Sequence, residues 1–256
     1  MSLSLFQTKS LLKLKATPLI VLLALFILVI SFTLSDVNIA KKYKLFEDIL
    51  LVSQTFLLHM VAIFYSFELM QKEQLNGMFI LPLSTGIKRK NYLQAIFLSL
   101  MIVLFILLLI FLLIDTVLLL MLNNFNFFVM WQLVLYYLSA SLLAASVVMF
   151  AQYVSNMNAM IYSVLFFLIG QGLDELWLFL NHPNIVSEVS MYFANALYYF
   201  LPNYSLFDHI SIVVNRMDID MVNIMIVPVM YFIGLLCIYF LIAYKKYSTK
   251  VLKVGE

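Results

Sequence analysis

Long runs of apolar residues make up most of this chain, and short polar segments separate them. Because a helix rises about 1.5 Å per residue, about 20 apolar residues cross a hydrocarbon core about 30 Å thick. The uncharged stretch from Thr116 to Leu173 is long enough for two such helices, with polar turns around Asn126 and at residues 155–158. The pattern therefore predicts six membrane spans, at about residues 16–35, 49–67, 91–114, 128–153, 159–174 and 221–244.

The composition excludes an ordinary soluble domain. Hydrophobic residues make up 65% of the chain, charged residues only 11%, and the mean hydropathy is +1.05. Cys237 is the single cysteine, which excludes an intramolecular disulfide, and no Cys or His cluster predicts a metal site. We expect an all-α integral membrane protein with one transmembrane domain, residues 1–256, and no metal or cofactor bound by this chain.

The basic residues indicate the orientation of the spans. With six spans, both termini share one side of the membrane with the loops at residues 68–90 and 155–158. That side then carries eleven basic residues and the opposite side four, whereas seven spans would give eight and seven. Because Lys and Arg concentrate in cytoplasmic loops, the count favours six spans with both termini in the cytoplasm.

The outer loop, residues 175–220, contains a second uncharged stretch at 189–207. If this stretch does not cross the membrane, it either enters and returns or lies along the interface. Asn195 and the Pro202–Asn203 pair suit a broken helix of that kind, which is tolerated where protein or a watery cavity covers it. We expect a re-entrant or interfacial segment, with a seventh span as the alternative.

The first 15 residues interleave apolar side chains with Lys9, Lys13 and Lys15. This pattern indicates a short amphipathic helix on the cytoplasmic surface, or else a simple basic anchor.

The loop at residues 68–90 is the densest polar segment of the chain. A helix with charged positions opens it, Gly77 and Pro82 are expected to end that helix, and three basic residues close the loop. Its order of an acidic residue, Gly, apolar residues, Leu-Pro-Leu-Ser and a basic trio resembles the permease subunits of type-2 ABC transporters, which are mostly bacterial exporters. The segment 200–208 also resembles the branch grouped with multicopper-enzyme maturation. The residues that match or shape the loop are Glu68, Glu73, Gly77, Pro82, Ser84 and Lys88.

This resemblance implies a chain that works with partners in the bacterial cytoplasmic membrane. Two permease subunits, identical or different, would pair, and each loop would dock on a separate ABC ATPase that binds ATP and Mg²⁺. The chain itself has no GxxxxGK[ST] phosphate loop, so we expect no ATP hydrolysis and no catalytic residue in it. As an alternative, Glu68 and Glu73 belong to a solvated helix face, and the basic trio serves only topology.

Polar residues at membrane depth are costly and therefore functional candidates. His59 lies about eleven residues into the second predicted span. It either lines a translocation path or makes a hydrogen bond to a neighbouring helix without a transport role. The same two alternatives hold for Asn156, Gln171 and Asn195.

Further polar residues are expected at the outer interface. We expect Asp115 to be hydrated there, and Tyr204 to belong to an aromatic belt. Asp174 and Glu175 are expected to be ordinary outer-loop residues, with attraction of a cation as the alternative.

Two other function classes remain open from the sequence. A non-transporting scaffold or complex subunit would share the same hydropathy pattern. An intramembrane enzyme is less favoured, because the chain has neither GxSxG nor HExxH. No sequence pattern identifies the substrate.

Overall fold

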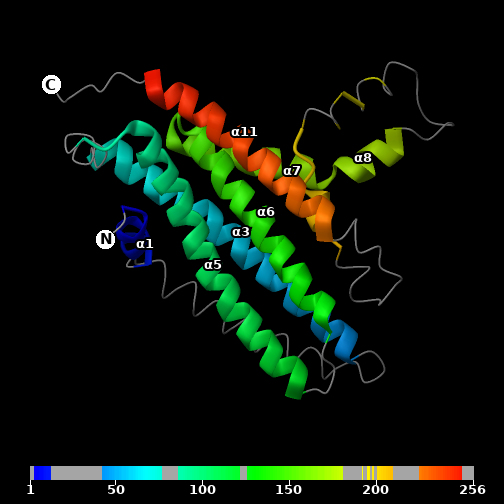
Figure 1. The fold of residues 1–256 in the computed structure, drawn as a ribbon. Helices are drawn as coiled ribbons and strands as arrows, with labels where there is room; N and C mark the ends of the chain where they lie inside the picture. Colours follow the sequence, from blue (N-terminus) through cyan, green and yellow to red (C-terminus); the bar gives the residue numbers. More distant parts are fainter. Residues whose placement is uncertain are drawn as a thin grey trace.

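The computed structural model describes residues 3–12, 42–76, 86–121, 126–180, 192, 195, 196, 198, 201–209 and 225–249. Within these ranges all regular structure is helical, which confirms the all-α expectation. The predicted span at residues 16–35 lies outside the described residues. The elements are α1 (Leu3–Leu12), α3 (Lys42–Asn76), α5 (Arg89–Met121), α6 (Phe127–Phe150), α7 (Asn156–Gln171), α8 (Leu173–Leu180), the short 3₁₀ turn η2 (Ser205–Phe207) and α11 (Val227–Thr249) (Figure 1).

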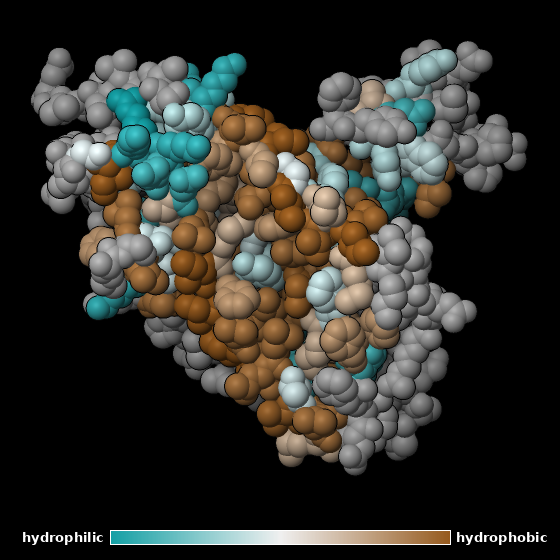
Figure 2. Space-filling view, viewed as in Figure 1, coloured by the Kyte–Doolittle hydropathy of each residue, from teal (hydrophilic) through white to brown (hydrophobic). Residues whose placement is uncertain are grey.

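Four described segments are long and apolar enough to cross a membrane: Phe46–Lys72, Arg89–Met121, Phe127–Phe150 and Val227–Tyr247. α7 and α8 follow each other with a bend of 48° and would add a fifth crossing if they form one span. Apolar side chains cover the middle of the molecular surface, and hydrophilic ones gather toward its upper left and upper right (Figure 2). These features are those of a multi-pass membrane protein.

The polar turns noted in the sequence lie next to helix starts. α6 begins after Asn126, whose Oδ1 accepts a hydrogen bond from the backbone N–H of Phe128 at 3.0 Å. α7 begins after Ser155. An N-cap side chain satisfies one of the free N–H groups at a helix start, which explains why the polar residue marks the beginning of α6.

α3 is one unbroken helix of 35 residues. No Gly or Pro interrupts it, and Glu68 and Lys72 form an ion pair at 3.4 Å one turn apart. The described part of α3 extends to Asn76. Residues 68–76, expected as a separate loop helix, thus continue the span before them.

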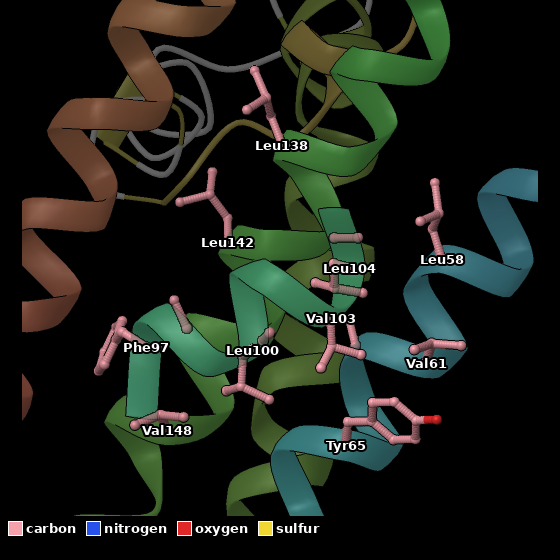
Figure 3. Packing of buried hydrophobic residues seen from close by; sticks show 14 of the residues in the cluster. Leu58, Val61, Tyr65, Phe97, Leu100, Val103, Leu104, Leu138, Leu142 and Val148 are labelled. Atoms are coloured by element: carbon pink, nitrogen blue, oxygen red, sulfur yellow. The ribbon is translucent and has the colours of Figure 1, made fainter. Parts of the chain in front are cut away.

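α6 lies at the centre of the bundle and packs against α3, α5, α7 and α11. Residues 138–149 are all buried. Leu58 and Val61 of α3, Leu100 and Val103 of α5 and Leu142 of α6 belong to the buried cluster seen at close range in Figure 3. Helices in membranes associate through close packing, which small side chains permit, and α6 supplies them at Ser139, Ala140, Ser141, Ala144 and Ala145.

α1 packs against α5, but its faces differ from the expected amphipathic pattern. Ser4, Gln7 and Thr8 are buried, whereas Leu5 and Phe6 are 48% and 57% exposed. The positions 4, 7, 8 and 11 share one helix face, so the mainly polar stripe faces the protein. Thr8 satisfies its hydroxyl within the helix, donating to the carbonyl of Ser4 at 2.8 Å.

The ends of three helices meet at one end of the bundle. The Arg89 guanidinium, at the start of α5, donates to the backbone carbonyl of Tyr247 in α11 at 3.4 Å. α1 lies at the same end as the C-terminal end of α11 (Figure 1). We call this the Arg89 end.

Candidate functional site

Polar side chains from four helices meet around the segment 201–209, in the half of the bundle away from the Arg89 end. We call this group the Asp208 cluster. Its members come from α3, α6, α7, α8 and the segment itself, although they are far apart in sequence. They are Thr55, His59, Gln132, Tyr136, Ser139, Gln171, Asp174, Asn203, Ser205, Asp208 and His209.

Gln132 fixes the end of the segment to α6. Its side chain is fully buried, its Nε2 donates to the carbonyl of Phe207 at 2.8 Å, and its Oε1 accepts from the backbone N–H of His209 at 3.2 Å. Both ends of one amide therefore satisfy backbone groups that a buried loop would otherwise leave unpaired.

Gly170 lets the segment approach the backbone of α7. The N–H of Tyr204 donates to the carbonyl of Gly170 at 3.0 Å. A Cβ atom at position 170 would lie 2.3 Å from the carbonyl oxygen of Pro202 and 2.7 Å from Cδ2 of Tyr204. Only glycine fits this contact.

Asp174 and Asn203 join the segment to α8. The Asn203 Nδ2 donates to Asp174 Oδ1 at 2.8 Å, and the Ser205 hydroxyl donates to Asp174 Oδ2. Asn203 Oδ1 accepts from the backbone N–H of Ser205 at 3.0 Å, which forms an Asx turn. The N–H of Asn203 donates to the hydroxyl of Tyr231 at 2.6 Å, so α11 is attached as well.

His59 lies beside a small cavity under the segment. Its Nδ1 is 2.8 Å from the carbonyl of Thr55 and its Nε2 is 3.0 Å from the hydroxyl of Ser139 on α6. A carbonyl only accepts, so Nδ1 carries a proton, and in the neutral ring Nε2 accepts from Ser139. The cavity has a volume of about 40 Å³, room for about one water, and Tyr136, Gln171 and Asp208 also line it.

Asp208 lies where this cavity meets a larger pocket. Its Oδ1 accepts from the hydroxyl of Tyr136 at 3.0 Å and its Oδ2 from Nε2 of Gln171 at 3.3 Å, while the side chain stays exposed. The outer pocket has a volume of about 540 Å³, and Gln171 and Asp208 line both spaces. Asp174, Glu175 and His209 also line the outer pocket.

The outer pocket is acidic. The described residues around it are Leu168, Gln171, Gly172, Asp174, Glu175, Ser205, Leu206, Asp208 and His209. Burial lowers the pKa of His209 from its ordinary value, and the negative charge of Asp208 opposes this only in part. His209 is therefore neutral near pH 7 and adds no positive charge to the three carboxylates.

The structure brings together some of the residues singled out from the sequence. His59, Gln171, Pro202 and Asn203 lie in or beside the Asp208 cluster. Asn156 lies at the first residue of α7, far along that helix from Gln171. Asn195 accepts a hydrogen bond from Nε1 of Trp177 at 2.9 Å, beside α8.

The loop residues are described only in part. Glu68 pairs with Lys72, and Lys88 is exposed just before α5. The side chain of Glu73 and residues Gly77, Pro82 and Ser84 lie outside the described residues.

Two expectations for interfacial residues were wrong. Asp115 is fully buried, because α5 continues beyond it to Met121 and its side chain faces α3 rather than water. Tyr204 is 1% exposed, because it packs with Phe167 and against the backbone at Gly170. Asp174, in turn, has a specific structural role rather than that of an ordinary loop residue.

Sequence reasoning missed the residues that organise the site. Gln132 and Tyr136 lie one turn apart in an apolar run, and Asp208 falls within the predicted outer loop, residues 175–220. The spacing of Gln132 and Tyr136 was the available signal, because it puts both on one helix face. Among the described residues, no group of three His, Cys, Asp or Glu is arranged to hold a metal ion.

Comparison with protein-family models, with curated proteins and with solved structures found no match.

Proposed function

We propose that this chain is the membrane-spanning permease subunit of an ATP-binding cassette exporter. It would move a substrate across the bacterial cytoplasmic membrane, with both termini in the cytoplasm. ATP and Mg²⁺ would bind to a separate ATPase subunit that docks on the loop at residues 68–90. A second permease subunit would complete the transporter. The Asp208 cluster would then lie toward the outer side.

The observation that carries this proposal is the continuity of α3. The same unbroken helix bears Glu68 and Lys72 near the loop and Thr55 and His59 in the Asp208 cluster. From His59 to Asn76 is about 25 Å at the rise of an α-helix. A helix without Gly or Pro moves as a rigid element, so a push on the loop would displace the cluster.

A second connection starts from the other end of the loop. Arg89, which opens α5, is bonded to the carbonyl of Tyr247 in α11. The same α11 reaches the segment 201–209 through the hydroxyl of Tyr231, which accepts from the N–H of Asn203. Both ends of the loop are therefore linked by a helix to the segment, as a coupled transporter requires.

The test is to co-express the chain with its neighbouring genes and purify the chain in mild detergent. We expect the ATPase to co-purify and to hydrolyse ATP. Glu73→Arg and Pro82→Trp, both in the loop, should abolish its capture. Gly234→Ala is the matched control, because a methyl group there meets no atom within 4 Å.

Two outcomes would overturn the assignment: no ATPase is captured, or capture is the same with and without the loop substitutions. In the second case the chain would be a scaffold that binds the ATPase through another surface.

A further inference from the structure

A buried carboxyl group lies between α3 and α5, away from the Asp208 cluster. Asp115 of α5 is fully buried, and Gln54 of α3 is 2% exposed. The Gln54 Nε2 donates to Asp115 Oδ1 at 2.6 Å. Among the described residues, neither Asp115 Oδ2 nor Gln54 Oε1 has a hydrogen-bond partner.

With the carboxyl group ionised, two oxygens that can only accept are thus left unsatisfied at one helix contact. An unpaired buried polar atom costs about 1–3 kcal/mol, and a buried carboxylate without a partner costs more. Among the described residues, the contact lacks a positively charged group or a second hydrogen-bond donor for these two oxygens.

Among the residues whose side chains the structure describes, the neighbouring helices offer no basic residue at this depth. On α3, the charged residues between Phe46 and Gln54 are the acids Glu47 and Asp48. Between Tyr92 and Met121, α5 has no ionisable residue except Asp115, and the ionisable residues of α6 are Tyr136 and Tyr137. His59 is engaged with Thr55 and Ser139.

A metal ion does not fit the contact either. Hard cations such as Ca²⁺ and Mg²⁺ take six or more oxygen ligands, whereas this contact offers the two free oxygens.

We propose that Asp115 is a proton-binding site within the membrane, and that its carboxyl group is neutral at neutral pH. The bound proton sits on Oδ2 and is donated to Gln54 Oε1, which closes a ring of two hydrogen bonds between the acid and the amide. One proton thereby satisfies both unpaired oxygens and removes the charge. The ring joins α3 to α5 and does not depend on the chain being an exporter subunit.

The test uses the full-length protein in lipid bilayers, with ¹³C in the side-chain carboxyl of every aspartate. Infrared spectra at neutral pH should contain the carbonyl band of a protonated carboxyl group, shifted by the label. Exposed carboxyl groups are ionised at this pH and do not contribute. Absence of a label-sensitive band from the wild-type protein would overturn the proposal, and this result needs no variant.

Three variants identify the residue. Asp115→Asn should remove the band yet keep the melting temperature, because its amide can both donate to Gln54 and accept from it. Asp115→Leu should lower the melting temperature, since it leaves the side-chain amide of Gln54 without a hydrogen-bond partner. Gln54→Leu should shift the band to higher frequency, because the acid loses its partner.

Glu68→Gln is the control, because Glu68 forms an ion pair with Lys72, and it should leave the band unchanged. A band that persists in Asp115→Asn, or an Asp115→Asn protein that melts as low as Asp115→Leu, would overturn the proposal.

Discussion

Tyr204 and Gly170 are joined through their backbones, the N–H of Tyr204 donating to the carbonyl of Gly170 at 3.0 Å. This bond seats the segment 201–209 directly on α7. The bond forms at a glycine, which has no side chain. The position of the segment on α7 therefore depends on the absence of a single methyl group at residue 170.

Gly170→Ala should therefore displace the segment 201–209 from α7. The new Cβ meets the backbone oxygen of Pro202 at 2.3 Å, and overpacking of this kind costs about 1–3 kcal/mol. Thermal unfolding in detergent and hydrogen exchange at the Tyr204 amide would measure the loss. Gly234→Ala should be neutral or stabilising by up to about 1 kcal/mol, since it gains helix propensity without a clash. Equal effects at both positions would contradict the close contact at Gly170.

Gln132→Leu should destabilise the protein by leaving two backbone groups unpaired, the carbonyl of Phe207 and the N–H of His209. Each buried unpaired group costs about 1–3 kcal/mol. Gln152→Leu is a matched control, because Gln152 is also buried but its Nε2 bonds only the carbonyl of Val148, in the last turn of α6, which ends just before Gln152. Unfolding midpoints should fall clearly more for the first variant than for the second.

Asp174 and Asn203 should show a favourable coupling in a double-mutant cycle. Asn203→Asp alone places two carboxyl groups face to face and should destabilise the contact. Combining it with Asp174→Asn exchanges acid and amide, which restores the hydrogen bond in the opposite direction. Coupling energies of about 0.5–3 kcal/mol are usual for residues in contact. A double variant no more stable than Asn203→Asp would show that the two side chains do not interact.

His209 should make the stability of the folded protein fall in acid. Burial lowers the pKa of its imidazole in the folded protein below the ordinary value of 6.5. Between the two pKa values the unfolded chain binds more protons, so stability rises with pH through this window and falls as the pH drops below 6.5. Unfolding midpoints measured across this range should decline less in His209→Gln. An unchanged pH dependence in that variant would assign the effect to another group.

The sequence located the long apolar helices among the described residues, although not their full lengths, because a membrane span has a minimum length. An apolar run must be long enough to cross the bilayer, and Asn126 marks the start of α6 by its capping hydrogen bond, whereas Ser155 precedes α7 without one. The continuation of α3 through residues 68–76 was missed because charged residues suggested a break. A helix leaving the membrane needs no apolar side chains, and only Gly or Pro would have ended it.

The Asp208 cluster was predictable only in part, for a reason of distance. His59 and Gln171 were noticeable because each is polar in an apolar run. Gln132 and Asp208 are 76 positions apart in sequence. Their membership of one site could be recognised only once the fold showed them in the same cluster. The burial of Asp115 was likewise invisible, because the direction of a side chain around a helix depends on which neighbour it meets.

α6 and α11 differ in what surrounds them, and this sets the substitutions that each tolerates. In the most apolar 18-residue stretch of α6, 78% of the residues are buried by protein, whereas in that of α11 only 17% are. On α11, lipid accepts one apolar side chain as readily as another, so Leu, Ile and Phe should exchange with little effect. On α6, shape decides instead: Ala144 and Ala145 have neighbours on every side, and a larger side chain there would push helices apart even if it were more hydrophobic.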